Sequence, residues 1–186
     1  MLRSLMLLSL LVVLGACQAT GPRADFDVSR DFNQYQTWSW ADPPVTYAPN
    51  NDPRLASDLT TQRVEEAVSG QLDVRGLRPA QDAASADLKV RASVVLETRR
   101  DNVTTHYGGG WGYWGPYWGG PGYSQTRTVD YQVMTLQIDL LDAADGRLVW
   151  RGSDSKIVRD RMSPAERSQE MHERAARVLS NYPPNY

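Results

Sequence analysis

Residues 134–152, MTLQIDLLDAADGRLVWRG, decide how this chain folds. Apolar and polar residues alternate along the first half of the stretch, as in a strand that buries one face. Asp145-Gly146 then provides a turn, and apolar residues that we expect to face inward return at Leu148, Trp150 and Ile157. The stretch therefore predicts a β-hairpin, with the Trp150 indole buried beneath a helix.

Strand patterns also precede this hairpin. Residues 86–97 alternate with one apolar face, formed by Leu88, Val90, Ala92, Val94 and Leu96. Residues 129–133 alternate in the opposite phase to residues 134–140, which predicts either a bulge near Val133 or burial of both faces there. Residues 26–28 and 37–40 have strand composition, and Trp38 and Trp40 are expected in the same core. Residues 41–53 contain four prolines and are predicted to form a loop.

Two helices are indicated by the residues at their ends. Asp52-Pro53 resembles an N-cap followed by a first-turn proline, and Gly76 resembles a stop, so we expect a helix from Pro53 to Val74. Leu55 and Leu59 open its apolar stripe. A capping box, Ser163-Pro164-Ala165-Glu166, begins the second helix. The elements together predict an α+β fold: an antiparallel sheet of four to five strands with two helices packed on one face.

The first residues predict export. Arg3 precedes an apolar run over residues 5–14, which is about half as long as a membrane-spanning helix. Leu14-Gly15-Ala16-Cys17 follows this run directly and resembles the bacterial lipobox, which is cut before its cysteine. The expected organisation is a signal peptide over residues 1–16, a lipidated tether over 17–25 and a single α+β domain over 26–186.

Cys17 is the predicted site of lipid attachment. An ordinary signal peptide followed by a chance cysteine is the alternative. Cys17 is the only cysteine in the chain, and a lone free thiol in an oxidising compartment argues against that alternative. The lipobox implies a diacylglyceryl thioether, and two or more acyl chains anchor a protein stably. Gln18 stands where an aspartate often retains lipoproteins in the inner membrane, so we expect the periplasmic face of the outer membrane.

The sequence predicts no catalytic residue and no cofactor. His106 and His172 are the only histidines, and no Gly-x-Ser-x-Gly elbow occurs. Gly110-x-Gly112-x-x-Gly115 matches the spacing of a dinucleotide fingerprint, but a proline follows it and no helix opens there. The formal net charge of −2 gives no footprint for nucleic acid.

Clustered acids do not predict a metal site. Asp139, Asp142 and Asp145 are spaced by three, whereas a calcium loop needs a different register, so they are interpreted as a strand end and a turn. Glu65 and Glu66 are adjacent on a helix and diverge around it, which disfavours a site built from two carboxylates.

Residues 107–123 form an insertion of glycine, proline and aromatic residues. It contains no aliphatic side chain that could build a core, and ordering so many glycines is costly. The insertion is either a mobile hairpin tip without a ligand, or a tip that contacts a protein partner, a membrane surface or a glycan. Its candidate binding residues are Trp111, Tyr113, Trp114, Tyr117 and Trp118.

Several stretches of the chain resemble a family of bacterial envelope lipoproteins known as domain of unknown function 4136. The resemblance spans residues 25–184 and rests on Asp31-Phe32-x-x-Tyr35-x-Thr37-Trp38-x-Trp40, Ala86-Asp87-Leu88, Leu136-x-Ile138-Asp139-Leu140-x-Asp142, Gly146-x-Leu148-Val149-Trp150-Arg151-Gly152 and Tyr182-Pro183-Pro184. It implies a lipoprotein with a compact α+β domain. It transfers no catalytic residue, because the family has no assigned activity.

These observations predict a non-enzymatic binding or assembly module. Lipid on Cys17 would hold it to the membrane, and its partner would be an envelope protein or glycan. A dedicated glycan-binding module and an envelope-polymer hydrolase are the alternatives. The lack of a nucleophile–base pair disfavours the hydrolase.

Overall fold

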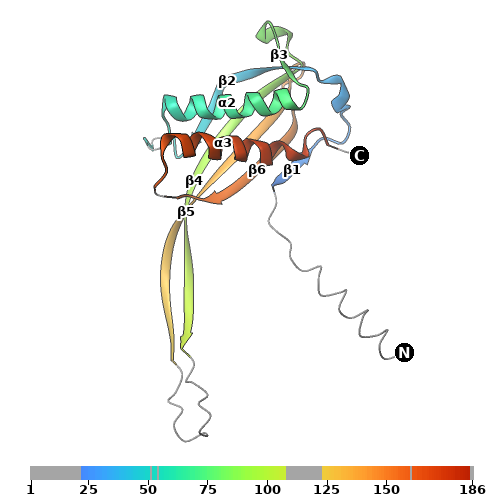
Figure 1. Cartoon of the computed structure of the whole chain (residues 1–186). Helices are drawn as coiled ribbons and strands as arrows, with labels where there is room; N and C mark the ends of the chain where they lie inside the picture. Colours follow the sequence, from blue (N-terminus) through green and yellow to red (C-terminus); the bar gives the residue numbers. More distant parts are fainter. Residues whose placement is uncertain (1–21, 51, 54, 108–122, 160, 185–186) are drawn as a thin grey trace, which may run out of the picture.

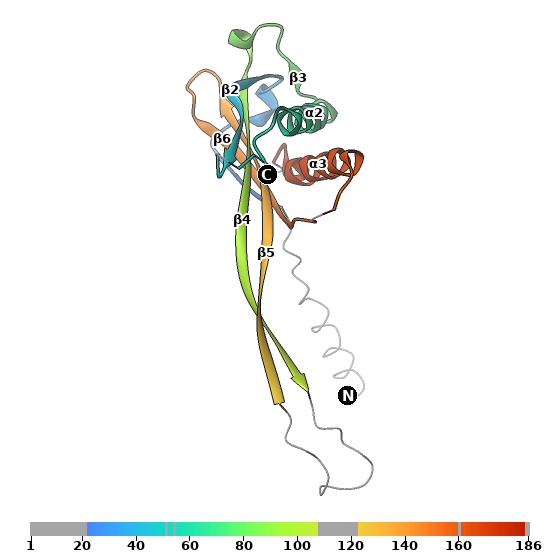
Figure 2. The same cartoon turned by 90° about the vertical axis from the view of Figure 1, so that its left-hand side faces the viewer.

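A six-stranded sheet is the framework of the domain (Figure 1). The computed structural model describes residues 22–50, 52–53, 55–107, 123–159 and 161–184. The strand order is β1-β6-β5-β4-β2-β3. The strands are β1 (Arg23–Phe26), β2 (Thr37–Ala48), β3 (Arg78–Pro79), β4 (Leu88–Tyr107), β5 (Tyr123–Asp142) and β6 (Leu148–Ile157). Helices α2 (Asp58–Val74) and α3 (Pro164–Val178) lie side by side on one face of the sheet, as both views show (Figures 1 and 2).

The expected antiparallel sheet of four to five strands was wrong, because the sheet is mixed. β2 pairs in parallel with both β3 and β4, and Trp38 lies opposite Leu88. The other pairings, between β1 and β6, β6 and β5, and β5 and β4, are antiparallel. The physical reason lies in the chain order. α2 separates β2 from β4, and a helical crossover returns the chain to the end of the sheet from which a parallel strand can start.

β2 also extends into the stretch that was expected to be a loop. Its pairing with β4 shifts between Trp40 and Val45, so residues 41–44 bulge opposite Arg91 alone. Pro43 and Pro44 lie in this bulge, where a strand tolerates residues that lack a backbone N–H. The strand then resumes its pairing as far as Ala48.

α2 begins five residues later than the Pro-based signal predicted. Ser57 is its N-cap, and the Ser57 hydroxyl accepts a hydrogen bond from the Thr60 backbone N–H at 3.2 Å. Leu55 lies in the segment before the helix and is buried, whereas Leu59 lies in the helix, is 61% exposed and does not join the core. The predicted capping box of α3 is confirmed, because Ser163 and Glu166 cap each other reciprocally.

The predicted β5–β6 hairpin is confirmed, with one extra residue in β6. Leu140 pairs with Trp150 but Leu141 pairs with Leu148, which leaves Val149 as a bulge. The bulge buries both Val149 and Trp150. Leu148 is consequently 42% exposed, so its expected inward position was wrong.

The phase change in β5 comes from burial on both faces. β5 pairs with β4 across Val133 without a register shift, and its pairing with β6 begins at Val133. Val133 is buried, and so is Leu136 on the opposite face of the strand. Ile157, which pairs with Val133 at the end of β6, is 57% exposed rather than inward as expected.

Aromatic side chains fill the core under the helices, as predicted. Trp38 is buried and meets Trp40 edge to face, with ring centroids 5.3 Å apart. Trp150 is fully buried and meets Tyr182 in the same way at 5.6 Å. Gly152 leaves the room that Trp150 occupies, because a Cβ on Gly152 would lie 2.3 Å from the indole and 2.9 Å from the Val178 carbonyl oxygen.

Gly152→Ala is therefore expected to destabilise the domain. The new methyl group would displace either the buried indole or the end of α3, and overpacking of this kind costs about 1–3 kcal/mol. The measurement is the free energy of unfolding from urea titrations followed by circular dichroism.

Gly70→Ala is the matched control. A Cβ at Gly70 meets no atom within 4 Å, and the residue lies inside α2, so alanine should stabilise the helix by up to about 1 kcal/mol. Equal effects of the two substitutions would contradict the packing argument.

Candidate functional site

The sequence-predicted site residues lie outside the part of the chain that the structure describes. These are Cys17 and the tip aromatics Trp111, Tyr113, Trp114, Tyr117 and Trp118. Their points of attachment are described. The tether enters at Arg23 in β1, and the tip joins the far ends of β4 and β5. Within the described ranges, no helix is long and apolar enough to cross a membrane.

β4 and β5 continue beyond the sheet as a ribbon of two strands (Figures 1 and 2). β4 pairs with β2 as far as Val95, and β5 pairs with β6 only from Val133 onward. The β4–β5 ribbon, residues 98–107 and 123–132, is held by the ten pairs from Thr98↔Gln132 to Tyr107↔Tyr123. At about 3.3 Å per residue, the β4–β5 ribbon reaches roughly 30 Å from the domain.

The side chains of the β4–β5 ribbon are mostly polar and exposed. Arg100 forms an ion pair with Asp130 at 2.9 Å, and the Thr104 and Thr126 hydroxyls are 2.9 Å apart across the strands. The hydrogen bond that Arg100 donates, together with its positive charge, holds the pKa of the Asp130 carboxyl below its usual range. These contacts tie the two strands to each other and not to the core.

Each of the three spaced aspartates pairs with an arginine: Asp139 with Arg151, and both Asp142 and Asp145 with Arg30. Asp139 accepts two hydrogen bonds of 2.7 Å from the Arg151 guanidinium, across the β5–β6 pair. Asp142 accepts from Arg30 and from the Tyr35 hydroxyl, each at 2.8 Å. Burial, together with the hydrogen bond to Asp142, raises the pKa of Tyr35 to about 12, so its hydroxyl stays protonated and donates. In the described ranges, no cluster of three or more acidic, His or Cys side chains could hold a metal ion.

The two histidines lie on separate elements. His106 is exposed in the β4–β5 ribbon. His172 is on the exposed side of α3, with Nδ1 2.9 Å from the Ser168 carbonyl oxygen. Glu66 accepts a hydrogen bond from Gln62 on the surface of α2. The described residues therefore do not bring His106, His172 and Glu66 together in one site.

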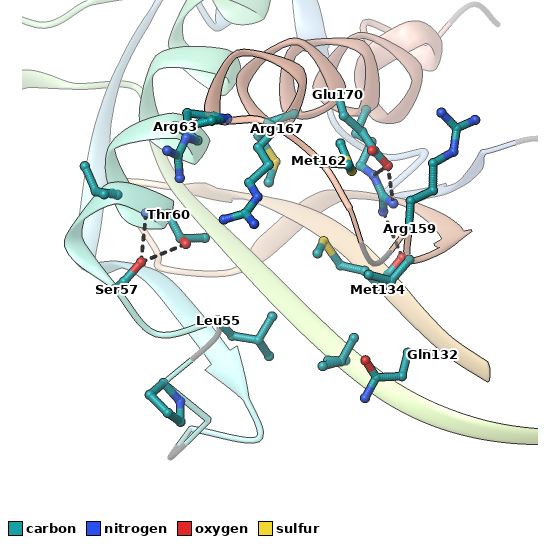
Figure 3. A pocket seen from close by; sticks show the side chains of 17 residues that line it. Leu55, Ser57, Thr60, Arg63, Gln132, Met134, Arg159, Met162, Arg167 and Glu170 are labelled. Carbon is teal, nitrogen blue, oxygen red and sulfur yellow. Dashed lines mark hydrogen bonds and ion pairs between the residues drawn. The ribbon is translucent and has the colours of Figure 1, made fainter. Parts of the chain in front are cut away.

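A pocket that the sequence did not predict lies between the first turns of α2 and α3 and the base of the β4–β5 ribbon (Figure 3). Its volume is about 570 Å³. The apolar part of its wall includes Leu55, Leu96, Met134, Met162 and Met171. The segments before α2 and α3, the strands β4 and β5, and α3 itself contribute these side chains, so the pocket exists only in the folded domain.

Arginines occupy the polar side of this pocket. Arg63 extends from α2 and Arg167 from α3 into the same hollow (Figure 3), and neither forms an ion pair with a described acid. Arg174 is buried and donates to the Met134 carbonyl oxygen and to Glu170, both at 2.9 Å. Burial alone would raise the pKa of Glu170, but the hydrogen bond and charge of Arg174 outweigh it and lower the pKa. Glu170 is therefore ionised and already paired.

One signal in the sequence could have pointed to this pocket. The chain has five methionines, and apart from Met1 and Met6 all of them line the pocket. Their spacing follows no motif, because they come from β5, the segment before α3 and α3 itself. The described lining contains neither a catalytic motif nor a run of aromatic residues, so no continuous pattern in the sequence marks it.

The stretches that carry the family resemblance form structural ties. Tyr35 bonds to Asp142, Arg151 bonds to Asp139, and Asp87 joins β2 to β4. Asp87 Oδ2 accepts from the Gln36 and Thr37 backbone N–H groups and from the Thr37 hydroxyl, at 3.0, 2.8 and 2.8 Å. The hydrogen bond from Gln36, with those from Thr37, holds the pKa of the Asp87 carboxyl below its usual range.

Asp87→Asn is expected to destabilise the domain by about 1 kcal/mol at neutral pH, because a neutral amide accepts these hydrogen bonds less strongly. The folded-state pKa of Asp87 is lowered, so its contribution is present above the ordinary pKa near 4 and is lost as pH falls through the folded value. Urea unfolding at about pH 7 and about pH 3 measures this, and the gap between wild type and variant should narrow in acid. Asp101→Asn on the exposed ribbon is the control, and a gap that does not depend on pH would contradict the assignment.

Solved structures similar to this chain come from bacterial proteins. A PDZ domain protein from Parabacteroides distasonis is 12% identical, with a TM-score of 0.51, over 96% of this chain and 40% of its own. The chain thus spans 40% of that protein's length, and at this identity the likeness shows the fold alone. A DUF4136 family protein from Bacteroides thetaiotaomicron is 16% identical over 87% and 95% of the two chains, with a TM-score of 0.48. PelC from Paraburkholderia phytofirmans, solved as a dodecamer, is 15% identical over 86% and 94%, with a TM-score of 0.46.

Comparison by family gives a match over almost the whole domain. Among curated proteins, none matches the chain. The family described as Domain of unknown function (DUF4136) matches residues 22–184. This range contains every described strand and helix, from β1 to α3. The chain therefore belongs to the DUF4136 family.

Proposed function

We propose that this chain is a lipid-anchored, non-enzymatic binding module of the bacterial envelope, held at the periplasmic face of the outer membrane through lipid on Cys17. The observation that carries the proposal is the β4–β5 ribbon, which extends away from the domain (Figure 2) and whose strands are joined in the sequence by the aromatic tip segment. The proposed partner is an envelope protein that contacts the ribbon or the tip.

The β4–β5 ribbon is built as a surface for contact. A ribbon of two strands is only marginally stable in water by itself. Beyond the Gln132 carbonyl, which accepts from the Val158 N–H, each outer edge has backbone N–H and C=O groups that no other described strand pairs, which makes the edge a template for a partner strand. Its exposed threonines and charged residues contribute nothing to the core of the domain. A long, polar extension of this kind is best explained by an interaction outside the domain.

The proposed anchor keeps the domain close to the membrane. Five residues lie between Cys17 and Arg23, the first residue of β1, so the six Cα-to-Cα steps of the tether span at most about 21 Å. The β4–β5 ribbon is longer than this tether. The tip can therefore contact either the anchoring membrane or a partner well beyond the domain.

Mass spectrometry of the mature N-terminus tests the anchor. Protein purified from membranes should begin at Cys17 and carry two or more acyl chains, which is what stable anchoring requires. Cys17→Ala should abolish the modification and release the protein from the membrane fraction. Unmodified Cys17 in the membrane-purified protein would disprove the lipoprotein assignment.

Replacement of Trp111, Trp114 and Trp118 by alanine tests the tip. A photo-crosslinker at Thr128 on the β4–β5 ribbon should capture an envelope protein in cells, and the triple variant should reduce the yield about tenfold or more, because aromatic anchors dominate protein interfaces. Val28, Val74 and Leu148 are exposed apolar residues of the domain, so their joint replacement by alanine is the matched control.

The same variants distinguish the glycan alternative. If the tip binds glycans, the triple variant should lose retention on purified envelope polysaccharide and keep its protein crosslinks. If protein crosslinks, glycan retention and membrane association all survive the triple replacement, the binding role of the tip is wrong. Unfolding by urea checks that each variant is folded.

A further inference from the structure

We infer that the pocket between α2, α3 and the base of the β4–β5 ribbon binds an anionic single-chain amphiphile: one acyl chain that ends in a carboxylate or phosphate head (Figure 3). This site goes beyond the proposed function. It uses neither the lipid on Cys17 nor the aromatic tip, so its test is independent of theirs.

The pocket has the size and the wall that an alkyl chain requires. Its volume of about 570 Å³ lies within the range of roughly 300–1,000 Å³ that is typical of small-molecule sites. Met134, Met162 and Met171 provide flexible thioethers, which adapt to chains of different shape. The described lining contains no aromatic ring, which disfavours a sugar or a base held by stacking.

The charges in the pocket select an anion. Arg63 and Arg167 come from different helices, and no described acid neutralises them. Glu170 is the only acid in the described lining, and it is paired with Arg174 at 2.9 Å and Lys156 at 3.5 Å. The lining therefore keeps uncompensated positive charge beside its apolar wall.

Arginine defines the chemistry of the head group. Its planar guanidinium donates two parallel hydrogen bonds to a carboxylate or a phosphate, and both anions match this geometry. Inorganic phosphate alone would leave the methionine wall in water. A neutral hydrophobic compound would gain no ion pair from Arg63 and Arg167. An acyl chain with an anionic head satisfies both parts of the pocket.

Titration calorimetry below the critical micelle concentration tests the inference. The protein is the chain from residue 17 with Cys17→Ala, which retains every described residue. Laurate and lauroyl lysophosphatidylglycerol represent the carboxylate and the phosphate head, and dodecanol is the neutral compound with the same chain length. We expect one saturable site for at least one of the two anions. Dodecanol should bind at least about ten times more weakly than that anion.

Paired substitutions locate the site. Arg63→Gln with Arg167→Gln should weaken the better anion about tenfold or more, with little change in dodecanol binding. Arg127→Gln with Arg147→Gln removes the same charge at exposed positions outside the pocket and should leave the affinity within about twofold. Met162→Glu places a carboxylate in the wall and should abolish binding of both anions. Circular dichroism checks the fold of each variant.

The outcomes separate clearly. If laurate binds more tightly, the head group that the pocket recognises is the carboxylate of a fatty acid. If lysophosphatidylglycerol binds more tightly, the head group is a lipid phosphate. Three results would overturn the inference: no saturable binding of either anion, dodecanol that binds as tightly as the anions, or an equal loss in the pocket pair and the control pair. Crosslinking through the tip is measured separately and should not respond to Arg63→Gln or Arg167→Gln.

Discussion

Twenty consecutive residue pairs, from Leu88↔Asp142 to Tyr107↔Tyr123, join β4 to β5 without a register shift. The inner half of this pairing carries the other strands and the two helices, and the outer half is the β4–β5 ribbon. A slip of one residue would turn the buried side chains of both strands toward solvent, so the core fixes the register. The ribbon has no core of its own and inherits its register from the domain. Core packing therefore determines which residues face each other about 30 Å away.

Local signals predicted the local features of the fold. The β5–β6 hairpin, the α3 capping box and the burial of Trp150 each depend on neighbouring residues, and each is confirmed. The parallel pairing of β2 with β4 was missed because strand direction depends on the crossover through α2, and the extension of β2 beyond Trp40 was missed because Pro43 and Pro44 give residues 41–44 the composition of a loop. Leu148 was placed wrongly because the bulge at Val149 depends on the partner strand, and no alternation within β6 reveals it.

The candidate sites also divide into those that are local in the sequence and one that only the fold brings together. The lipobox and the aromatic tip are continuous in sequence, so they could be predicted, and they remain predictions. The pocket takes residues from α2, β4, β5 and α3, and no spacing rule brings them together. Its arginines resemble ordinary surface charges in the sequence. Only the fold shows that Arg63 and Arg167 share one hollow and form no ion pair with a described acid.

The length of the β4–β5 ribbon also affects how strongly a partner must bind. If Cys17 carries lipid, the tether of at most about 21 Å, the domain and the ribbon of about 30 Å together limit how far from the membrane the tip can reach. A partner embedded in the same membrane then meets the tip at an effective concentration that can reach the millimolar range. A contact too weak to isolate from solution can therefore be occupied most of the time at the membrane surface.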